Sequence, residues 1–384
     1  MLAPVTYTFI CSRCAVELLA YWIGFNKVRG IGPARLRALL DAFGSVEAAW
    51  LAPADALREV GLDRRSLANL VQARGELDLA AEVARAASAG VDVLTWDDPR
   101  YPERLMAIND PPPVLYIRGD LRPDDDWAVA MVGTRHASAY GKEAARLIAT
   151  DLARAGATVV SGLARGIDAV VHRATLEAGG RTLAVLGSGI DIIYPWENLK
   201  LAQDIAEHGA LISEYPLGTQ PEASNFPPRN RIISGLSRGV VVVEAGEKSG
   251  ALITASYAAD QGRDVFAVPG SIFQRGCLGT NRLIRDGATP IVAASDVLEA
   301  LNLMSVPQQV EAHMLFPTDA TEAILLDQLA GDPAHVDAVC QATGLPIATV
   351  TSTLALMELK GMVRHTGGMS YIRAREAGPV YQVD

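Results

Sequence analysis

The stretch FPPRNRIISGLSRGVVVVEAGEKSGALITA, from Phe226 to Ala255, decides the fold. Its four consecutive valines predict a buried strand, and the Gly/Lys/Ser loop behind them leads into the start of a helix. Three arginines precede the valines, so this region forms a basic surface suited to phosphate. The whole chain carries a formal net charge of -10, which opposes indiscriminate binding of polyanions. Any nucleic-acid site must therefore be focal.

The region around this stretch alternates between apolar strands and amphipathic helices. Segments such as WAVAMVG, ATVVSG, RTLAVLG, ALISEYP, DVFAVPG and TPIVA are separated by helical patterns such as GKEAARLIATDLARAG. Valine-rich strands that alternate with helices indicate a mainly parallel sheet covered on both faces. The sequence thus predicts an α/β fold with a doubly wound, Rossmann-like sheet.

Shifts in composition divide the chain into four parts. Dense prolines between Trp96 and Trp127 exclude a helix there and predict an extended connector with one strand, VLYI. We expect a helical N-terminal domain at 1–97 (SAM-like or helix-hairpin-helix-like), a Rossmann-like domain at 98–302, a linker at 303–318 and a winged-helix-like domain at 319–384. Residues 1–14 read as an irregular tail, and whether they belong to the native protein is open.

The cysteines and the first residues of the chain bear on its cellular compartment. Cys11 and Cys14 form a CxxC without a second pair, so neither a disulfide framework nor a zinc ribbon is indicated. A reducing, cytoplasmic setting fits best. The apolar opening is interrupted by Arg13 and Glu17, which argues against a targeting or membrane segment and therefore against a membrane partner.

Small residues stand where nearly every predicted strand ends. In open α/β sheets the ligand crevice lies at these carboxyl ends, where backbone amides and helix N-termini attract anions. Two prolines predict the first turn of a short helix that would hold Arg229 and Arg231 as a bidentate phosphate clamp. The alternative is that one of these arginines pairs with a glutamate at a neighbouring strand end, Glu214 or Glu244.

The loop after the valine strand has the residues of a phosphate site. Lys248 supplies charge, Ser249 can cap the next helix, and Gly250 lets a backbone come close. The alternative is an ordinary capped helix start. GTRHASAYG repeats the pattern, with Arg135 after a strand and Ser138 before a helix, and GLARGID repeats it again.

No catalytic or metal-binding arrangement is legible. GSGID begins like a dinucleotide fingerprint, but Ile192 stands where the third glycine would be, so the evidence for NAD is weak. Asp168 and Asp191 could bind a ribose or act as a base, although capping a helix explains each better, and His172 fits a structural role. We expect no catalytic residue, no metal and no cofactor.

Four motifs occur in one order: GTRHASAYG, SGLARGIDAVVHRATLEAGGRTLAVLGSGIDIIYPWEN, FPPRNRIISGLSRGVVVVEAGEKSGALITA and VPGSIFQRGCLGTNRLIRDGA. Together they resemble the DprA family, the DNA-processing proteins of natural transformation, from about Tyr101 to Leu301. The flanking regions resemble the family's helical N-terminal and winged-helix-like domains. The resemblance implies a homodimer without cofactor that binds and protects single-stranded DNA and loads the RecA recombinase onto it, in transformation, in repair or in both.

Carried over position by position, the resemblance places the DNA pocket at the carboxyl ends of the strands. Phe226, Tyr140 and Tyr194 are aromatic candidates, and for Tyr140 a place in the core is favoured. The predicted DNA-binding residues are Gly133, Arg135, Ser138, Ser161, Gly162, Gly166, Gly187, Ser188, Gly189, Phe226, Arg229, Asn230, Arg231, Lys248, Ser249 and Gly250.

The rival interpretation is an enzyme. Nucleotide phosphoribohydrolases of the lysine-decarboxylase-like family resemble this chain in an arginine before the strand and a glycine-rich loop after it. Their mark is PGGxGTxxE, with a catalytic glutamate. Here the stretch reads EAGEKSGALIT, which puts Leu252 or Ile253 at the glutamate's position and argues against hydrolysis.

The flanking domains say less about function. GIGP, from Gly30 to Pro33, resembles a helix-hairpin-helix turn that could hold one DNA phosphate, and the alternative is a plain helical packing module. Near the C-terminus, helical patterns and a two-stranded wing that turns at Gly367 and Gly368 indicate a winged helix. Its recognition-type helix carries one cation, Lys360, so we expect a protein-interaction or weak DNA role.

Overall fold

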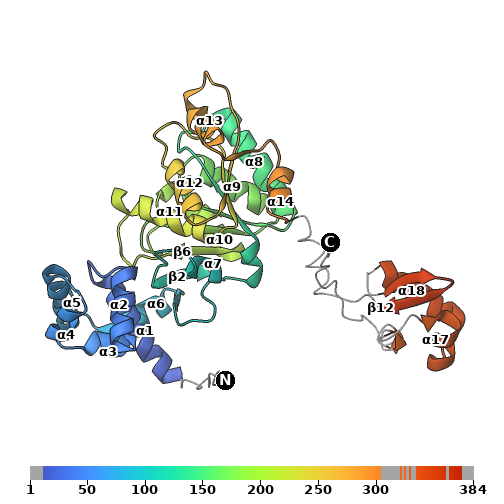
Figure 1. Ribbon diagram of the computed structural model, residues 1–384, viewed down its shortest axis with the longest axis horizontal. Coiled ribbons are helices and arrows are strands. Elements are labelled where there is room, and N and C mark those ends of the chain that lie inside the picture. The colour runs from blue at the N-terminus through green and yellow to red at the C-terminus, as the bar shows by residue number, and fades with distance from the viewer. Residues whose placement is uncertain are drawn as a thin grey trace, which may run out of the picture. The chain divides into compact units, whose positions relative to one another are not determined.

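The chain forms two compact units, Met1–Met304 and Ser305–Asp384 (Figure 1). The computed structural model describes residues 12–303, 321, 324–325, 328–329, 334–359 and 363–373. The tail at 1–11 and most of the predicted linker therefore lie outside the described residues.

Six helices occupy residues 12–88, as the helical pattern predicted. Their starts follow from capping, since Asp63 and Asp78 accept N–H groups from the first turns of the fifth and sixth helices, and Pro33 opens the second. The helices are α1 (Ser12–Lys27), α2 (Pro33–Phe43), α3 (Val46–Leu51), α4 (Ala54–Glu59), α5 (Arg64–Glu76) and α6 (Leu79–Ser88).

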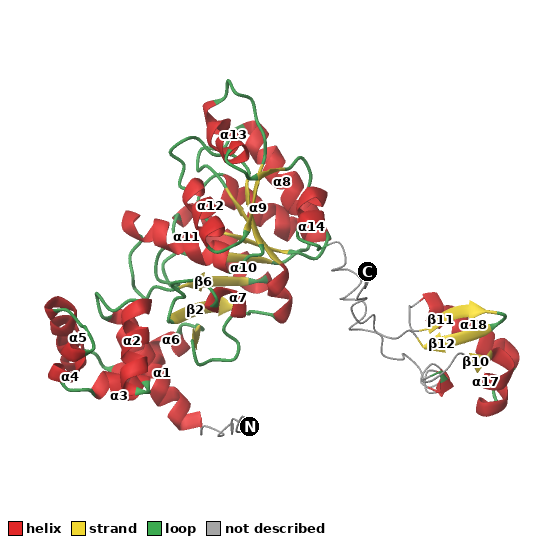
Figure 2. Ribbon diagram, viewed as in Figure 1, coloured by secondary structure: helices red, strands yellow, loops and turns green. Residues whose placement is uncertain are grey.

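A nine-stranded sheet forms the centre of the first unit (Figure 2). The strands are β1 (Asp92–Thr95), β2 (Val114–Gly119), β3 (Ala128–Val132), β4 (Thr158–Ser161), β5 (Thr182–Val185), β6 (Ala210–Ser213), β7 (Gly239–Val242), β8 (Asp264–Ala267) and β9 (Thr289–Pro290). The helices between and after them are α7 (Glu103–Met106), α8 (Ala139–Arg154), α9 (Ile167–Glu177), α10 (Leu199–His208), α11 (Phe226–Gly235), α12 (Ala251–Asp260), α13 (Leu278–Arg285) and α14 (Ala294–Ala300).

The strand order across the sheet is β1-β2-β6-β5-β4-β3-β7-β8-β9. In that order, the strands from β6 to β9 all run parallel to one another. The chain moves outward from β3 to β6 and then crosses back to place β7 on the other side of β3. The topological switch point therefore lies between β3 and β7, where doubly wound folds bind their ligands. The predicted fold class is confirmed.

Two details at the edge of the sheet differ from the sequence analysis. Strand β1 was not predicted, and it pairs antiparallel with β2, so the sheet extends across the predicted boundary at 97/98. The prediction that the proline-dense connector excludes a helix is wrong, because α7 forms one turn there. Pro102 stands at its N-cap, where a missing N–H costs nothing.

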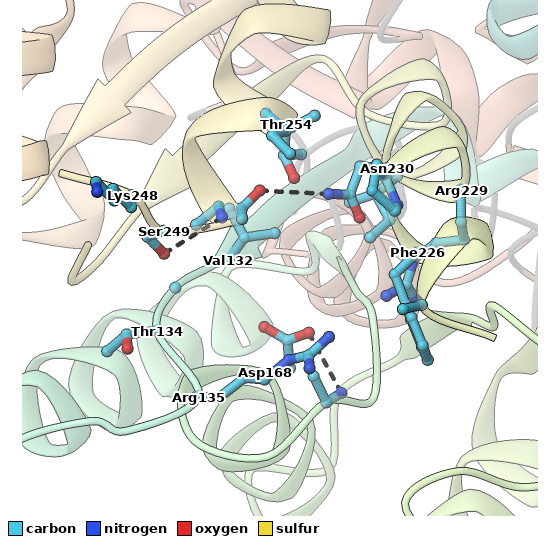
Figure 3. A pocket seen from close by; sticks show the side chains of 18 of the residues that line it. Val132, Thr134, Arg135, Asp168, Phe226, Arg229, Asn230, Lys248, Ser249 and Thr254 are labelled. Carbon is cyan, nitrogen blue, oxygen red and sulfur yellow. Dashed lines mark hydrogen bonds between the residues drawn. The ribbon is translucent and has the colours of Figure 1, made fainter. Parts of the chain in front are cut away.

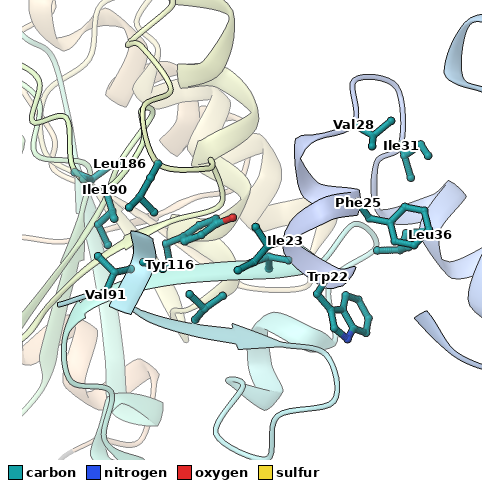
Figure 4. Packing of buried hydrophobic residues seen from close by; sticks show 14 of the residues in the cluster. Trp22, Ile23, Phe25, Val28, Ile31, Leu36, Val91, Tyr116, Leu186 and Ile190 are labelled. Carbon is teal, nitrogen blue, oxygen red and sulfur yellow. The ribbon is translucent and has the colours of Figure 1, made fainter. Parts of the chain in front are cut away.

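Two clusters of buried side chains cover the two faces of the sheet. On one face, α9, α10 and the N-terminal helices share a cluster that includes Tyr116 of β2 and Ile23 of α1 (Figure 4). The Tyr116 hydroxyl donates to Asn26 Oδ1 at 3.1 Å. On the other face, α7, α11 and α12 bury side chains such as Leu105 and Ile232. Each such side chain contributes about 1.5–3 kcal/mol when fully buried.

His172 lies in this interior as a neutral structural residue, as the sequence predicted. Thr182 Oγ1 donates to the Val159 carbonyl at 2.7 Å, so its lone pair is left to accept from His172 Nδ1, also at 2.7 Å. The other ring nitrogen, Nε2, is buried without a hydrogen-bond partner. Burial lowers the pKa of His172 to about 3, because a second ring proton would find no acceptor there.

This histidine predicts acid sensitivity. In the unfolded chain it binds a proton as the pH falls through about 6.5, whereas the folded protein does not, so the stability present above that pH is lost on acidification. Lowering the pH from 7 to 5 should cost about 2 kcal/mol of unfolding free energy through this residue. Urea denaturation of wild type and His172→Gln at both pH values measures it. The same loss in both proteins would contradict the assignment.

The second unit contains a winged helix domain, as predicted. Its described elements are β10 (Ala334–His335), α17 (Val336–Thr343), α18 (Ile347–Leu359), β11 (Val363–Gly367) and β12 (Ser370–Arg373). The two wing strands, β11 and β12, pair antiparallel. The domain has a buried cluster of its own, which includes Val339, Val350 and Leu354. Lys360, the predicted cation of the recognition-type helix, lies outside the described residues.

Among the described residues, no single helix is long and apolar enough to span a membrane. One pair of helices, α17 and the segment Ile347–Glu358, meets that length and composition together but is bent by 118°.

Candidate functional site

A cavity of about 740 Å³ opens at the switch point, where the carboxyl ends of β3 and β7 meet the N-terminal ends of α11 and α12 (Figure 3). Pockets of this volume typically hold small ligands. The lining residues are Val132, Gly133, Thr134, Arg135, His136, Ala164, Asp168, Tyr194, Pro221, Ala223, Phe226, Pro227, Arg229, Asn230, Ile233, Gly246, Lys248, Ser249, Gly250, Ala251, Ile253 and Thr254.

Two exposed cations border the cavity, Arg135 on the loop after β3 and Lys248 on the loop after β7. Neither forms an ion pair with another described residue. The guanidinium of Arg135 lies 5.2 Å from the ring centre of Phe226, which in turn lies 5.8 Å from the ring of Tyr194. A cation and two aromatic rings thus share one wall of the cavity.

The N-terminus of α12 faces the same space. Ser249 was predicted to cap this helix, but the N-cap is Gly250, and the Ser249 hydroxyl lies 3.4 Å from the Ala251 amide. A side-chain atom added to Gly250 would meet nothing within 4 Å, so the cavity is open at this point. Asn230 borders it from α11 and donates to the Gly250 carbonyl at 3.4 Å. The positive end of the helix dipole is therefore accessible to an anion.

Arg229 is placed differently from the exposed clamp that the sequence predicted. Its side chain is only 3% exposed, and its guanidinium donates to the carbonyl oxygens of Gly162, at 2.8 Å, and Val185. Burial lowers its pKa to about 10, against the attraction of the Asp168 carboxylate, so it remains charged at neutral pH. Arg229 lines the cavity, but its guanidinium ties together the ends of β4 and β5.

Arg231 does not line the cavity. Its Nη2 forms an ion pair with Glu214 Oε2 at 2.5 Å, and both side chains are largely buried. The alternative that one arginine pairs with a strand-end glutamate is confirmed for this residue. The other glutamate, Glu244, is buried and accepts from the Ser138 amide at 2.9 Å.

Three of the predicted site residues are serines that do not reach the cavity surface. The hydroxyls of Ser161 and Ser188 are buried and donate to the carbonyls of Met131 and Ile192, while Ser138 caps α8 through the Gly141 amide. None of these three serines lines the cavity. Ser161 and Ser188 use their hydroxyl protons within the protein, so neither is free to donate to a phosphate.

The glycines allow close approach of backbone and side chains. A side-chain atom on Gly187 would lie 2.8 Å from the Phe226 ring, and one on Gly162 would lie 2.7 Å from the Arg229 guanidinium. Gly166 has a φ of +78° and packs against the Thr134 carbonyl, a conformation and spacing that other residues do not fit. Of the predicted glycines, Gly133 and Gly250 line the cavity, and Gly162, Gly166 and Gly187 pack against residues that line it, whereas Gly189 packs against Pro216, Asp191 and Gly218.

The acidic residues also receive structural roles. Asp168 Oδ2 accepts from the amides of Gly162 at 3.2 Å and Ala164 at 3.3 Å, and burial raises the pKa of this carboxyl. Asp191 does not cap a helix as predicted, because it accepts from the Gly218 amide at 2.8 Å and pairs with Arg85. Among the described residues, no cluster of three or more His, Cys, Asp or Glu side chains could hold a metal ion.

The three aromatic candidates differ in whether they line the cavity. Tyr140, which was assigned to the core, is 46% exposed, and its hydroxyl donates to the Pro269 carbonyl. Tyr194 and Phe226 both line the cavity. Sequence reasoning missed Thr134, His136 and Thr254 as lining residues. Thr254 could have been found, because it lies four residues after Gly250 on the same face of α12.

Comparison with known proteins identifies the chain's relatives. A family model described as DNA recombination-mediator protein A matches residues 92–302. The chain belongs to the DprA family. A second model, the DprA winged helix domain, matches residues 310–369. The family consists of DNA-processing proteins and recombination mediators, which confirms the resemblance seen in the motifs.

Individual relatives extend this result. Protein Smf of Synechocystis is 37% identical over an alignment that covers 92% of this chain and 98% of that protein. DprA of Bacillus subtilis is 46% identical over an alignment that covers 55% of this chain and 72% of that protein. The crystal structure of Streptococcus pneumoniae DprA has a TM-score of 0.64 at 34% identity, and covers 73% of this chain and 97% of its own. A Helicobacter pylori DprA, solved for its single-stranded DNA binding mode, has a TM-score of 0.50 at 32% identity over 55% of this chain and 95% of its own.

Proposed function

We propose that this chain binds single-stranded DNA in the switch-point cavity. The observation that carries the proposal is the cavity itself, in which Arg135, Lys248 and the start of α12 offer positive charge beside the Tyr194–Phe226 ring pair. Proteins that bind single strands combine such cations for the phosphates with aromatic faces for the unstacked bases. The Helicobacter pylori relative, which binds single-stranded DNA, supports the same ligand here.

We further propose that the bound strand is incoming DNA, which the protein protects as a homodimer in the cytoplasm and onto which it loads the RecA recombinase. Support comes from family membership, because the matching model describes a recombination mediator. The winged helix domain then has a protein-interaction or weak DNA-binding role.

The enzymatic alternative receives no support from the site. Leu252 or Ile253 occupies the place of the hydrolase glutamate, and Ile253 lines the cavity. Asp168 is the acidic residue among the lining residues, and two loop amides hold its carboxylate in the wall. Incubation with AMP-like nucleotides should therefore release no base.

The decisive experiment compares single-stranded and duplex DNA by gel shift across a range of salt concentrations. We expect a preference for single strands and a log-log salt slope of about -1.4, from two cations at about -0.7 per phosphate. This slope is modest because Arg229 and Arg231 are engaged inside the protein. A preference for duplex, or affinity independent of salt, would contradict the cavity as the DNA site.

A further inference from the structure

Trp196 is an exposed tryptophan that the proposed site does not use. It follows Tyr194 by two residues, at the start of a 3-10 turn (Trp196–Asn198), and 78% of it is exposed to solvent. Trp22 and Trp50, by contrast, are 2% and 4% exposed, and Trp96 and Trp127 are half-buried. A tryptophan ring offers a large apolar face with a polar N–H, and a ring this exposed is available to another molecule.

The surroundings of Trp196 continue the wall of the cavity. Only Pro195 stands between Tyr194 and Trp196, so their Cα atoms are at most about 7.6 Å apart. A smaller hollow of about 30 Å³ is lined by Arg165, Tyr194 and Pro195, and shares Arg135 and Phe226 with the wall of the main cavity. Trp196 therefore follows directly in the chain on two residues that line this hollow, Tyr194 and Pro195.

The charges beside Trp196 favour a polyanion. Glu197 is matched by Arg165, whose Nε lies 2.7 Å from its Oε1. Arg173 reaches Asn198 at 3.4 Å, and Lys200 is exposed and forms no ion pair with another described residue. Arg173 also acts on Glu197, and Lys200 lies four residues after Trp196, so three cations accompany this one carboxylate. This combination suits a nucleotide with a phosphate at its side better than a purely apolar partner.

We propose that Trp196 is a stacking platform for a base just outside the switch-point cavity, so that a longer single strand leaves the cavity over Tyr194 toward Trp196. This inference rests on the proposed DNA-binding function. It adds a contact that the family motifs did not predict and gives the bound strand a direction across the surface.

Fluorescence and affinity test the proposal together. Oligothymidylates of about 4 and about 20 nucleotides are titrated into the full-length protein. We expect the longer strand to quench indole emission, and Trp196→Phe to abolish most of that quenching while it keeps affinity, because phenylalanine still stacks. Trp196→Ala should weaken binding of the longer strand about five- to one-hundredfold and of the shorter strand much less. The matched control is Leu199→Ala, which removes a neighbouring exposed apolar side chain and should change neither measurement.

The outcomes separate this inference from the proposed function. Wild-type affinity of Trp196→Ala for both strands, or quenching that survives in Trp196→Phe, would overturn the platform and leave the cavity intact. A wild-type protein that binds neither strand would overturn both. If Trp196→Ala changes the oligomeric state in size-exclusion chromatography and leaves affinity unchanged, the tryptophan serves a protein contact and the platform is wrong.

Discussion

Replacing Arg229 by methionine is expected to lower the free energy of unfolding by about 3–5 kcal/mol, because the change leaves buried partners without their cation. The carbonyls of Gly162 and Val185 would lose their donor, and the Asp168 carboxylate, whose pKa burial already raises, would lose the nearby positive charge. Methionine keeps most of the side-chain volume, so the loss measures the polar contacts rather than a cavity.

Urea denaturation at pH 7 checks this prediction, with Arg135→Met as the matched control. Arg135 is exposed and forms no ion pair with the other described residues, so the control should change stability by no more than about 0.5 kcal/mol. Equal stability of the two variants would mean that Arg229 is not held by the strand ends, and the phosphate clamp predicted from the sequence would then be restored.

The position of the site could be predicted from the sequence because it follows from topology. Runs such as Val240–Val243 predicted the strands. Parallel strands must end at one edge of the sheet, and the loops rich in glycine and serine therefore lie at that edge. Strand β1 was not predicted, because four residues next to a helical region are too few to show the alternation of apolar and polar side chains typical of a strand.

The roles of individual arginines could not be predicted, because they depend on partners distant in the chain. Arg229 finds acceptors 67 and 44 residues away, and Arg231 finds Glu214 across a loop. Only the folded protein shows that Arg135 forms no ion pair within the described part of the chain. The same holds for Tyr140, whose exposure depends on how the loop at Pro269 approaches α8.

Arg135→Ala combined with Lys248→Glu is expected to weaken single-stranded DNA binding by more than about a hundredfold. Each charge-assisted phosphate contact contributes about 1.5–3 kcal/mol, and the two residues stand on separate loops, so their effects should add. Because phosphate contacts carry no base identity, the loss should be similar for oligothymidylate and for mixed sequences. Fluorescence anisotropy at fixed salt measures both ligands.

A charge-matched control distinguishes a local site from the general field of an acidic protein. Arg64→Ala combined with Lys142→Glu changes the net charge by the same amount at exposed positions that do not line the cavity. Its DNA affinity should fall far less, since exposed charges more than about 8–10 Å from the strand are largely screened at physiological salt. Unchanged circular dichroism must accompany the loss in the cavity variant, because both residues are exposed and neither forms an ion pair with a residue that the structure describes. Equal losses in both double variants would show that net charge alone governs binding, and wild-type affinity of the cavity variant would place the strand elsewhere on the chain.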